Sequence, residues 1–585
     1  MKPDTRPHHA VLIEAEAFET FGGWVHDTQF MDQMGSPFLL AHGLGQPVAD
    51  AVTTVPLPEQ GRYRVWVRTR DWTAPWKRES TPESRRAHGT PGAFQLLLNG
   101  AALDTTFGTE SEAWHWQDGG VVELPGSEVE LRLHDLTGFD GRCDAILLTQ
   151  QLDTPPPDHA PAHWRRALLG LPEAPNDAGS FDLVVAGGGV AGMCAALAAA
   201  RLGSKVALLQ DRPVLGGNAS SEVCVNMHGE AGFEPYPRVG DIVKELQPDT
   251  EHYWHKGPFE DGSGMDAIRE SMLRDEENLS LFLNERVQEV EMEGQRICSL
   301  ITVNTRSSRQ TRFQGGLFAD CTGDAAVGHL ARADYDMTIN GHMGRTNLWF
   351  VHDTGSAQEF PSCPWALDLS ARPYPPPPEK IDGWYWESGF KHNPIRDGEY
   401  IRDWNLRAVF GAWSATKHGK EDYDTWAIKW FAYVSGMRES RRLLGDLVLN
   451  ETDLHHGIAY EDACVPLTWD MDTHRPEPDY HPGFEGDAFI ATADHIKYKR
   501  PYWLPYRCLY SRDVPNLFMA GRNISATRMA MGSSRVQRTT GMMGEIVGMA
   551  TAICRKHSVD PRTVYQKHLD ELKAQMSLGC GKGAQ

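Results

Sequence analysis

An apolar strand that runs directly into a glycine-rich turn constrains the fold of this chain more than any other feature. Residues 181–186 form the strand, and Gly187, Gly189 and Gly192 follow it in the G-x-G-x-x-G spacing. Such glycines let the backbone turn tightly, approach a pyrophosphate group and pack the next helix on its strand. An alanine-rich stretch and a second apolar run come next. This order predicts a β-α-β unit in an α/β domain that binds a dinucleotide.

The end of the second strand is where the nucleotide ribose is usually held. A hydrogen-bond acceptor is expected there, about 20 residues past the glycines, and Gln210 and Asp211 occupy this place. Either side chain is able to accept the bond. A second turn, Gly216-Gly217-Asn218-Ala219-Ser220, follows shortly after Arg212. Because a simple NAD domain has no use for a second glycine turn, the sequence favours a larger cofactor.

Two segments much later in the chain resemble further parts of one flavoprotein superfamily. Residues 320–324 read Asp-Cys-Thr-Gly-Asp at the end of an apolar strand, and residues 520–522 read Ala-Gly-Arg after another. Together with the two glycine turns, they resemble the FAD-dependent oxidoreductases of the glutathione-reductase-like superfamily, whose members have two dinucleotide-binding domains. Within it, the chain most resembles a subgroup often labelled xanthan lyase.

The resemblance implies that FAD is the cofactor and that these separated segments converge on it. The residues expected to bind FAD are Gly187, Gly189, Val190, Ala191, Gln210, Asp211, Arg212, Gly216, Gly217, Asn218, Ser220, Val287, Thr322, Gly323, Asp324, Gly521, Arg522, Ser533 and Arg535. Gly541, Gly544 and Gly548 follow on a stretch that we expect to form a closely packed helix.

The first 152 residues differ in pattern from the nucleotide-binding segment. They lack helical periodicity and contain short alternating runs, such as residues 62–68 and 128–133. This pattern predicts an antiparallel β-sandwich, and its end strands resemble those of jelly-roll modules that bind carbohydrate. In some such modules, acidic residues that match Glu14, Glu16 and Asp144 hold a structural calcium ion. Ordinary carboxylates at a sheet edge explain these three residues equally well.

Four tryptophans of this region, Trp72, Trp76, Trp114 and Trp116, allow two interpretations. Flat apolar rings stack on sugars, and they also fill the cores of β-sandwiches. Carbohydrate binding by this region is therefore one of two hypotheses.

We predict five segments along the chain, and one of them interrupts the nucleotide-binding domain. They are a carbohydrate-binding-like β-sandwich (1–152), a proline-rich linker (153–180), the first part of a Rossmann-like FAD-binding domain (181–330), an inserted α+β substrate domain (331–514) and the C-terminal part of the FAD-binding domain (515–585). The inserted segment is rich in tryptophan, and the spacing of Trp426 and Trp430 suggests one face of a helix. Other aromatic residues there are expected to line a substrate pocket.

Charge and hydropathy argue against several other functions. The chain has 57 basic and 79 acidic residues, a net charge of −22, which disfavours nucleic acid and anionic membranes as partners. It has no apolar stretch of the roughly 18 residues that a membrane span needs. The N-terminus lacks the apolar core of a signal peptide, so we expect a soluble, cytoplasmic protein. Ten cysteines occur without a C-x-x-C pair, which disfavours a redox disulfide or an iron–sulfur cluster.

A histidine near the return to the FAD-binding domain is the favoured catalytic base. His474 stands in a tract of tryptophan, aspartate and histidine that resembles the corresponding segment of the subgroup. Histidine suits proton transfer at neutral pH, and Asp472 or Asp470 would orient its ring. A solvated loop histidine is the competing explanation, and His228 is the reserve candidate.

An arginine-rich tract is the second candidate for catalysis. Gly436–Arg442 resembles the subgroup's G-x-R-E-S-R-R signature, which implies that Arg438 reaches the flavin or the substrate at the start of a helix. Ion pairs along the surface of that helix are the alternative. We assign no metal ligand to the active site.

These features predict an FAD-dependent oxidoreductase, either a dehydrogenase or an oxidase, whose electron acceptor the sequence does not identify. The expected substrate is a small molecule, and the expected reaction oxidises a hydroxyl of a sugar or glycoside to a carbonyl by hydride transfer to flavin. One alternative is desaturation or reduction of a carboxylated small molecule that Arg438, Arg441 and Arg442 would clamp. Another is a carbohydrate-binding protein with a vestigial flavin site.

Overall fold

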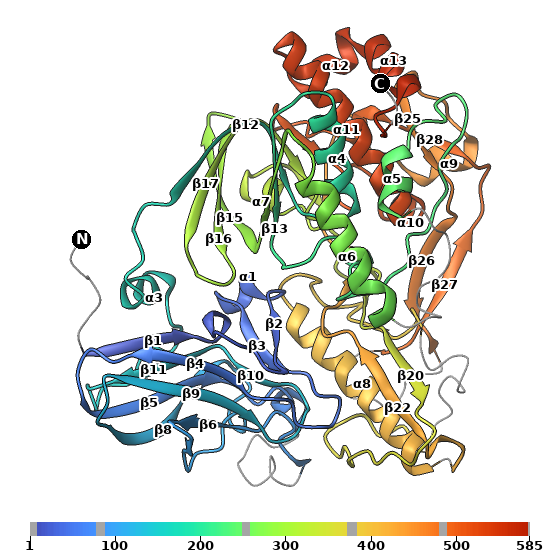
Figure 1. Cartoon of the computed structure of the whole chain (residues 1–585). Coiled ribbons are helices and arrows are strands. Elements are labelled where there is room, and N and C mark those ends of the chain that lie inside the picture. The colour runs from blue at the N-terminus through green and yellow to red at the C-terminus, as the bar shows by residue number, and fades with distance from the viewer. Residues whose placement is uncertain are drawn as a thin grey trace.

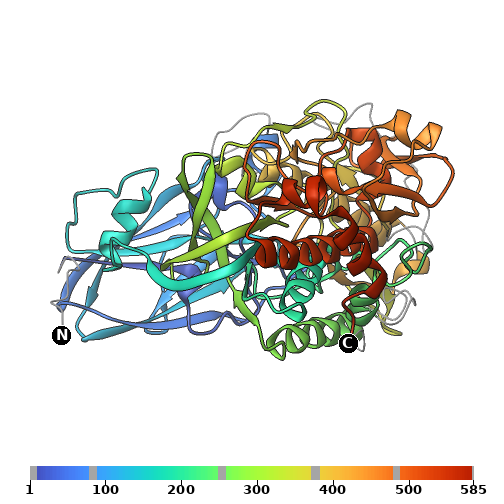
Figure 2. The same ribbon diagram turned by 90° about the horizontal axis from the view of Figure 1, so that it is seen from above.

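Three parts of the chain lie side by side in the computed structural model, which describes residues 9–77, 88–247, 258–370, 383–419, 421–478 and 488–582. In Figure 1 the antiparallel sheets of the N-terminal part lie below the α/β part, and the middle part, with its long helix, lies beside them. Figure 2 shows from above that the N-terminal sheets project to one side of the rest.

A mostly parallel sheet forms the centre of the α/β part. Its strand order is β14-β13-β12-β17-β16-β15, and β29 also pairs with β17. The strands span Leu279–Leu283 (β14), Val206–Gln210 (β13), Asn176–Ala186 (β12), Gln310–Asp320 (β17), Arg296–Asn304 (β16), Glu285–Glu293 (β15) and Leu517–Met519 (β29). The predicted β-α-β unit is therefore confirmed as β12, α4 (Val190–Arg201) and β13, with β12 and β13 parallel. In the C-terminal half of β12 both faces are buried from residue 183 to 186, which explains the continuous apolar run there.

The α/β part has helices on both faces of this sheet, most of them in the layer of α4 and α11. They are α4, α5 (Asp241–Leu246), α6 (Pro258–Arg274), α7 (Ala326–Leu330), α10 (Arg528–Ser534), α11 (Gln537–His557), α12 (Pro561–Lys567) and α13 (Leu569–Leu578), of which α7 lies on the opposite face with β15 and β16. A Cβ atom on Gly544 of α11 would lie 2.1 Å from the carbonyl oxygen of Ala191 in α4. The predicted close helix packing at these glycines is confirmed.

The N-terminal part consists of antiparallel sheets that enclose a shared core. Two four-stranded sheets, β1-β11-β5-β8 and β4-β9-β6-β7, bury apolar side chains between them, and a three-stranded sheet, β10-β3-β2, lies at their end. The strands span Ala10–Glu14 (β1), Val25–Asp27 (β2), Phe38–Ala41 (β3), Ala51–Pro56 (β4), Gly61–Thr69 (β5), Phe94–Leu98 (β6), Ala101–Ala102 (β7), His115–Leu124 (β8), Glu128–Asp135 (β9), Gly141–Cys143 (β10) and Ala145–Thr149 (β11). The antiparallel architecture is as predicted, and a jelly-roll topology stays a prediction.

The middle part contains short strand pairs around one long helix. Its elements are β18 (Tyr335–Asp336), β19 (Arg345–Thr346), β20 (Trp349–Asp353), β21 (Glu387–Ser388), α8 (Gly398–Gly419), β22 (Trp426–Phe431), β23 (Gly436–Met437), β24 (Arg442–Leu443), α9 (Glu451–His456), β25 (Ala463–Leu467), β26 (Met471–Pro476), β27 (Ala491–Ile496) and β28 (Tyr502–Pro505).

Trp426 and Trp430 lie on strand β22, so the predicted helix there is wrong. Arg438 lies between two short strands and not in a helix. No helix in the described part of the chain is long and apolar enough to span a membrane.

A short helix docks within the stretch predicted to be a linker. Helix α3 (Ala162–Leu168) places the buried Arg165 against Glu14, 3.0 Å away, and against Asp144. Arg68 approaches Asp144 to 2.7 Å as well. Two guanidinium groups therefore pair with two of the three carboxylates, whereas both oxygens of the buried Glu16 have no hydrogen-bond partner among the described residues. The ligand atoms of Glu14, Glu16 and Asp144 lie within 4.8 Å of one another, and calcium binding there stays a prediction.

The four tryptophans of the N-terminal part form hydrogen bonds within the protein. The indole N–H of each donates to a protein oxygen: Trp72 to Phe139, Trp76 to Tyr400, Trp114 to Glu399 and Trp116 to Pro157, at 3.0–3.1 Å. The Trp76 ring also packs 4.8 Å from the ring of Tyr400 in α8. These contacts support the packing interpretation of the tryptophans over sugar stacking.

The N-terminal part is joined to α8 by buried ion pairs. Arg142 on β10 lies 2.6 Å from both Glu399 and Asp403, and Arg402 lies 2.8 Å from Asp27 on β2. The side chains of all five residues are at most 5% exposed. Charges held this far from water are stable only while each has its partner. The N-terminal sheets are thus docked on the middle part.

We expect Arg142→Ala to lower the free energy of unfolding by about 3 kcal/mol, because it removes a buried guanidinium from Glu399 and Asp403 and leaves them only Arg70 at 3.0 Å and Arg402 at 2.8 Å. Urea denaturation of the full chain measures this change. The matched control is Arg132→Ala, whose ion pair with Glu130 is 40% and 35% exposed and should contribute little. An equal loss in the two variants would show that the interface charges do not hold the parts together.

Candidate active site

Two of the three glycines in the first turn are required by packing, and the third leaves space for a ligand. Gly187 has a φ of +100°, and a Cβ atom there would lie 2.4 Å from the carbonyl oxygen of Cys321. A Cβ atom on Gly192 would lie 1.8 Å from the carbonyl oxygen of Gly187. Both glycines are therefore required by packing inside the protein. A Cβ atom on Gly189 would meet only the Cα atom of Gly217, at 3.9 Å, so its space is left for a ligand.

A cavity of about 850 Å³ opens in front of this turn. Most residues assigned to FAD line it: Gly187, Gly189, Val190, Ala191, Gln210, Asp211, Arg212, Gly216, Gly217, Asn218, Val287, Thr322, Gly323, Asp324, Gly521, Arg522 and Arg535. Ser220 and Ser533 do not. The hydroxyl of Ser220 donates to the carbonyl of Gly217 and that of Ser533 to the carbonyl of Ala530, so both stabilise their own turn or helix.

The two residues at the end of β13 have separate roles. The side-chain oxygen of Gln210 accepts a hydrogen bond from the N–H of Gly188 at 2.8 Å, and its amide donates to the carbonyl of Val214 at 3.0 Å. Gln210 therefore holds the two glycine turns together. The carboxylate of Asp211 is 40% exposed and lines the cavity, and its role as acceptor for a ribose hydroxyl stays a prediction.

The Asp-Cys-Thr-Gly-Asp segment depends on an aspartate that the sequence interpretation did not select. Asp320 is fully buried and accepts hydrogen bonds from the N–H groups of Thr322 at 3.1 Å and Gly328 at 2.9 Å. It thereby fixes the turn that presents Gly323 and Asp324 to the cavity. Its burial and its place in the motif are the signals that identify it.

Arginines outnumber carboxylates around the cavity, although the whole chain is acidic. Those that line it are Arg212, Arg286, Arg345, Arg396, Arg441, Arg522 and Arg535, against Asp32, Asp211, Glu285 and Asp324. Arg345 is buried, and burial lowers its pKa to about 10. It donates to the carbonyl of Pro394 and forms no ion pair with any carboxylate in the described ranges. Nη1 of Arg522 is buried without a hydrogen-bond partner.

The cavity therefore fits FAD. Its open space at Gly189 lies at the N-terminus of α4, where free N–H groups favour the pyrophosphate. The unpaired guanidinium nitrogens supply further donors for an anionic cofactor. Helix α1 (Met31–Met34) of the N-terminal part also borders the cavity, through Met31, Asp32 and Gln33.

The candidate base lies in a buried charged network behind the cavity wall. Nδ1 of His474 lies 2.6 Å from Glu387, and its Nε2 lies 3.2 Å from Asp472 and 3.3 Å from the Arg535 guanidinium. Arg438 lies 3.3 Å from Glu387. The structure thus brings together the three predicted catalytic residues, His474, Asp472 and Arg438, although none of them lines the cavity. Arg535 lines the cavity and connects these three residues to it.

Glu387 is the residue of this network that the sequence interpretation missed. It is fully buried; desolvation alone would raise its pKa, but Arg438 and His474 outweigh this effect and hold the pKa at about 2. Desolvation is likewise outweighed at Asp472, where His474 and Arg535 lower the pKa. Both carboxylates are therefore ionised at neutral pH. The reserve candidate His228 lies in a separate cavity of about 260 Å³, next to Trp469.

These features define a dinucleotide-binding α/β protein whose nucleotide-binding sheet takes strands from both sides of the middle part, and comparison with known proteins identifies its family. Residues 182–350 and 398–576, more than half of the chain, match the family described as FAD dependent oxidoreductase. The chain belongs to this family, and its cofactor is FAD. No curated protein was found to match the chain.

Several solved structures show remote similarity to the chain. A glycerol-3-phosphate dehydrogenase from Bacillus halodurans in complex with FAD is 12% identical over 30% of this chain and 41% of that chain, less than half of its length, with a TM-score of 0.22. The myxobacterial chondrochloren halogenase CndH, a variant of FAD-dependent halogenases, is 13% identical over 66% and 78%, with a TM-score of 0.31. The Mycobacterium smegmatis Sdh1 complex is 13% identical over 65% and 69%, with a TM-score of 0.28.

Proposed function

We propose that this enzyme oxidises a hydroxyl group of a sugar or glycoside to a carbonyl. Bound FAD supplies the hydride acceptor. The proposal rests on one contact of His474. Its Nδ1 lies 2.6 Å from Glu387, which is ionised. This contact favours the tautomer with hydrogen on Nδ1, so Nε2, which faces the Arg535 guanidinium at 3.3 Å, would carry the lone pair that accepts the hydroxyl proton.

The charges around His474 support its use as a proton acceptor. When Nε2 takes up the proton, the carboxylate of Asp472 at 3.2 Å is placed to stabilise the new positive charge. The side chain of Arg535 lines the cavity and also reaches Nε2 of His474 at 3.3 Å. It donates a hydrogen bond to Asp472 at 2.9 Å. We infer that Arg535 positions both the substrate hydroxyl and the base.

A carboxylated substrate is the second candidate, and the unpaired Arg345 favours it. Of the three arginines first assigned to a carboxylate clamp, Arg442 is paired with Glu439 and Asp336, and Arg438 with Glu387. Only Arg441 lines the cavity. The clamp for this substrate class is therefore Arg345 with Arg441.

The substrate class is tested by mixing the oxidised enzyme anaerobically with neutral sugars, uronic acids and small carboxylates and recording the flavin absorbance. We expect the flavin to be bleached by a sugar. Bleaching by uronic acids and simple carboxylates alone would favour the second candidate and should then be weakened by Arg345→Met. A protein without flavin absorbance would favour a non-catalytic carbohydrate-binding protein.

A further inference from the structure

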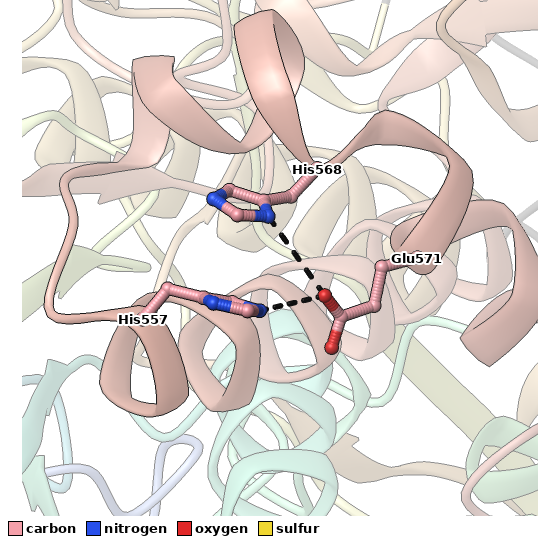
Figure 3. Close-up of side chains that lie close together, drawn as sticks. All are labelled: His557, His568 and Glu571. Carbon is pink, nitrogen blue, oxygen red and sulfur yellow. Dashed lines mark hydrogen bonds and ion pairs between the residues drawn. The ribbon is translucent and has the colours of Figure 1, made fainter.

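Three metal-ligating side chains meet at the C-terminal helices, remote from the FAD cavity. His557 is the last residue of α11, and His568 and Glu571 lie at the start of α13. Their ligand atoms all lie within 4.8 Å of one another. In Figure 3 both imidazole rings turn a nitrogen toward the same carboxylate oxygen of Glu571. Nε2 of His557 lies 2.7 Å and Nδ1 of His568 lies 3.9 Å from it.

The ligating nitrogens of the two histidines lie close together beside one carboxylate. Their rings stack with centroids 4.0 Å apart and planes inclined by 18°, so a rotation of the side chains out of this stack is needed for both nitrogens to point at one ion. His568 and Glu571 are three residues apart and therefore share one face of the helix start. Two imidazoles and a carboxylate form a donor set that suits zinc and neighbouring divalent transition metals.

A simple ion pair would explain only part of this geometry. Lys556 already lies 2.8 Å from the other carboxylate oxygen of Glu571, so the charge of Glu571 has a partner without either histidine. Stacking on His557 holds the His568 ring, but its Nδ1 lies 3.9 Å from Glu571, too far for a hydrogen bond. The two imidazole nitrogens are therefore available to an added cation beside the carboxylate.

We propose that His557, His568 and Glu571 bind a zinc ion. The three protein ligands leave a fourth coordination position for water or for a ligand from another molecule. Lys556 would hold the free oxygen of Glu571 and so orient the ligating one. The ion would tie α13 to the end of α11, the helix that packs against α4 at the FAD turn.

The proposal is tested on the full-length protein after treatment with a chelator. Zinc chloride is added in competition with a chromophoric zinc indicator, and thermal unfolding is recorded with and without zinc. We expect one tight equivalent of zinc and a rise in Tm that depends on its concentration. In His557→Ala and Glu571→Gln, zinc affinity should fall at least about tenfold, while the bound FAD is unchanged.

The matched control is His163→Ala, which removes an exposed histidine from α3 and should leave zinc affinity as in the wild type. The three ligands are partly exposed at the surface, so their variants are expected to fold, and the FAD absorbance verifies this. The proposal is overturned if the wild-type protein takes up no zinc. It is also overturned if both ligand variants bind zinc as tightly as the wild type.

Discussion

Gly189→Val is expected to give a folded protein that has lost its FAD. A side chain at this position meets no protein atom closer than the Cα of Gly217 at 3.9 Å, so the apoprotein has room for it. It projects into the space where the cofactor pyrophosphate approaches the backbone at the start of α4. We expect affinity for FAD to fall at least about 100-fold, or about 2.7 kcal/mol.

The measurement compares the FAD content of the purified variant, from its absorbance, with its Tm in the absence of FAD. Gly419→Val is the matched control, because a Cβ atom there meets nothing within 4 Å and the residue lies at the end of α8. Gly192→Ala is the contrasting case. Its Cβ atom would lie 1.8 Å from the carbonyl of Gly187, so it should lower the Tm as well. A Gly189→Val protein that retains FAD would show that the pyrophosphate lies elsewhere.

The parts of the fold that the sequence predicted are those with local causes. The glycines of the first turn are needed where a strand, a turn and a helix meet within 12 residues, so their spacing alone indicates the structure. Gln210 shows the limit of this reasoning. Its position is that of a ribose ligand, but its amide is committed to Gly188 and Val214, which are brought to it by the second turn.

Features that depend on distant pairing were not predictable from local patterns. A separation of four residues fits one face of a helix and also one face of a strand, so Trp426 and Trp430 did not distinguish the two. Glu387 reaches Arg438 because β21 pairs with β19, and β19 pairs with β23 next to Arg438. Glu387 also lies between the two segments that match the family, outside any recognised motif. The docking of Arg142 on α8 joins residues 257 positions apart.

His474→Ala is expected to slow flavin reduction by the substrate about 10²–10⁴-fold, the usual contribution of a general base. FAD should remain bound, because His474 does not line the cavity. His474→Gln is the sharper variant, since its amide is able to keep a hydrogen bond to Glu387 while it cannot accept a proton at neutral pH. Asp472→Asn should slow flavin reduction less than His474→Ala does. It removes the charge that stabilises the protonated ring but leaves the base in place.

Single-turnover mixing without oxygen measures these rates directly, with the substrate that bleaches the wild-type flavin. His495→Ala is the control: His495 pairs with Asp472 across β26 and β27, but its side chain is 47% exposed and is not in contact with His474. We expect the control to react at the wild-type rate. If His474→Ala and His474→Gln also reduce their flavin at that rate, the base is another residue, and His228 beside Trp469 is the next histidine to replace. If His474→Ala reduces its flavin slowly but His474→Gln does so at the wild-type rate, His474 only positions Glu387 and Arg535.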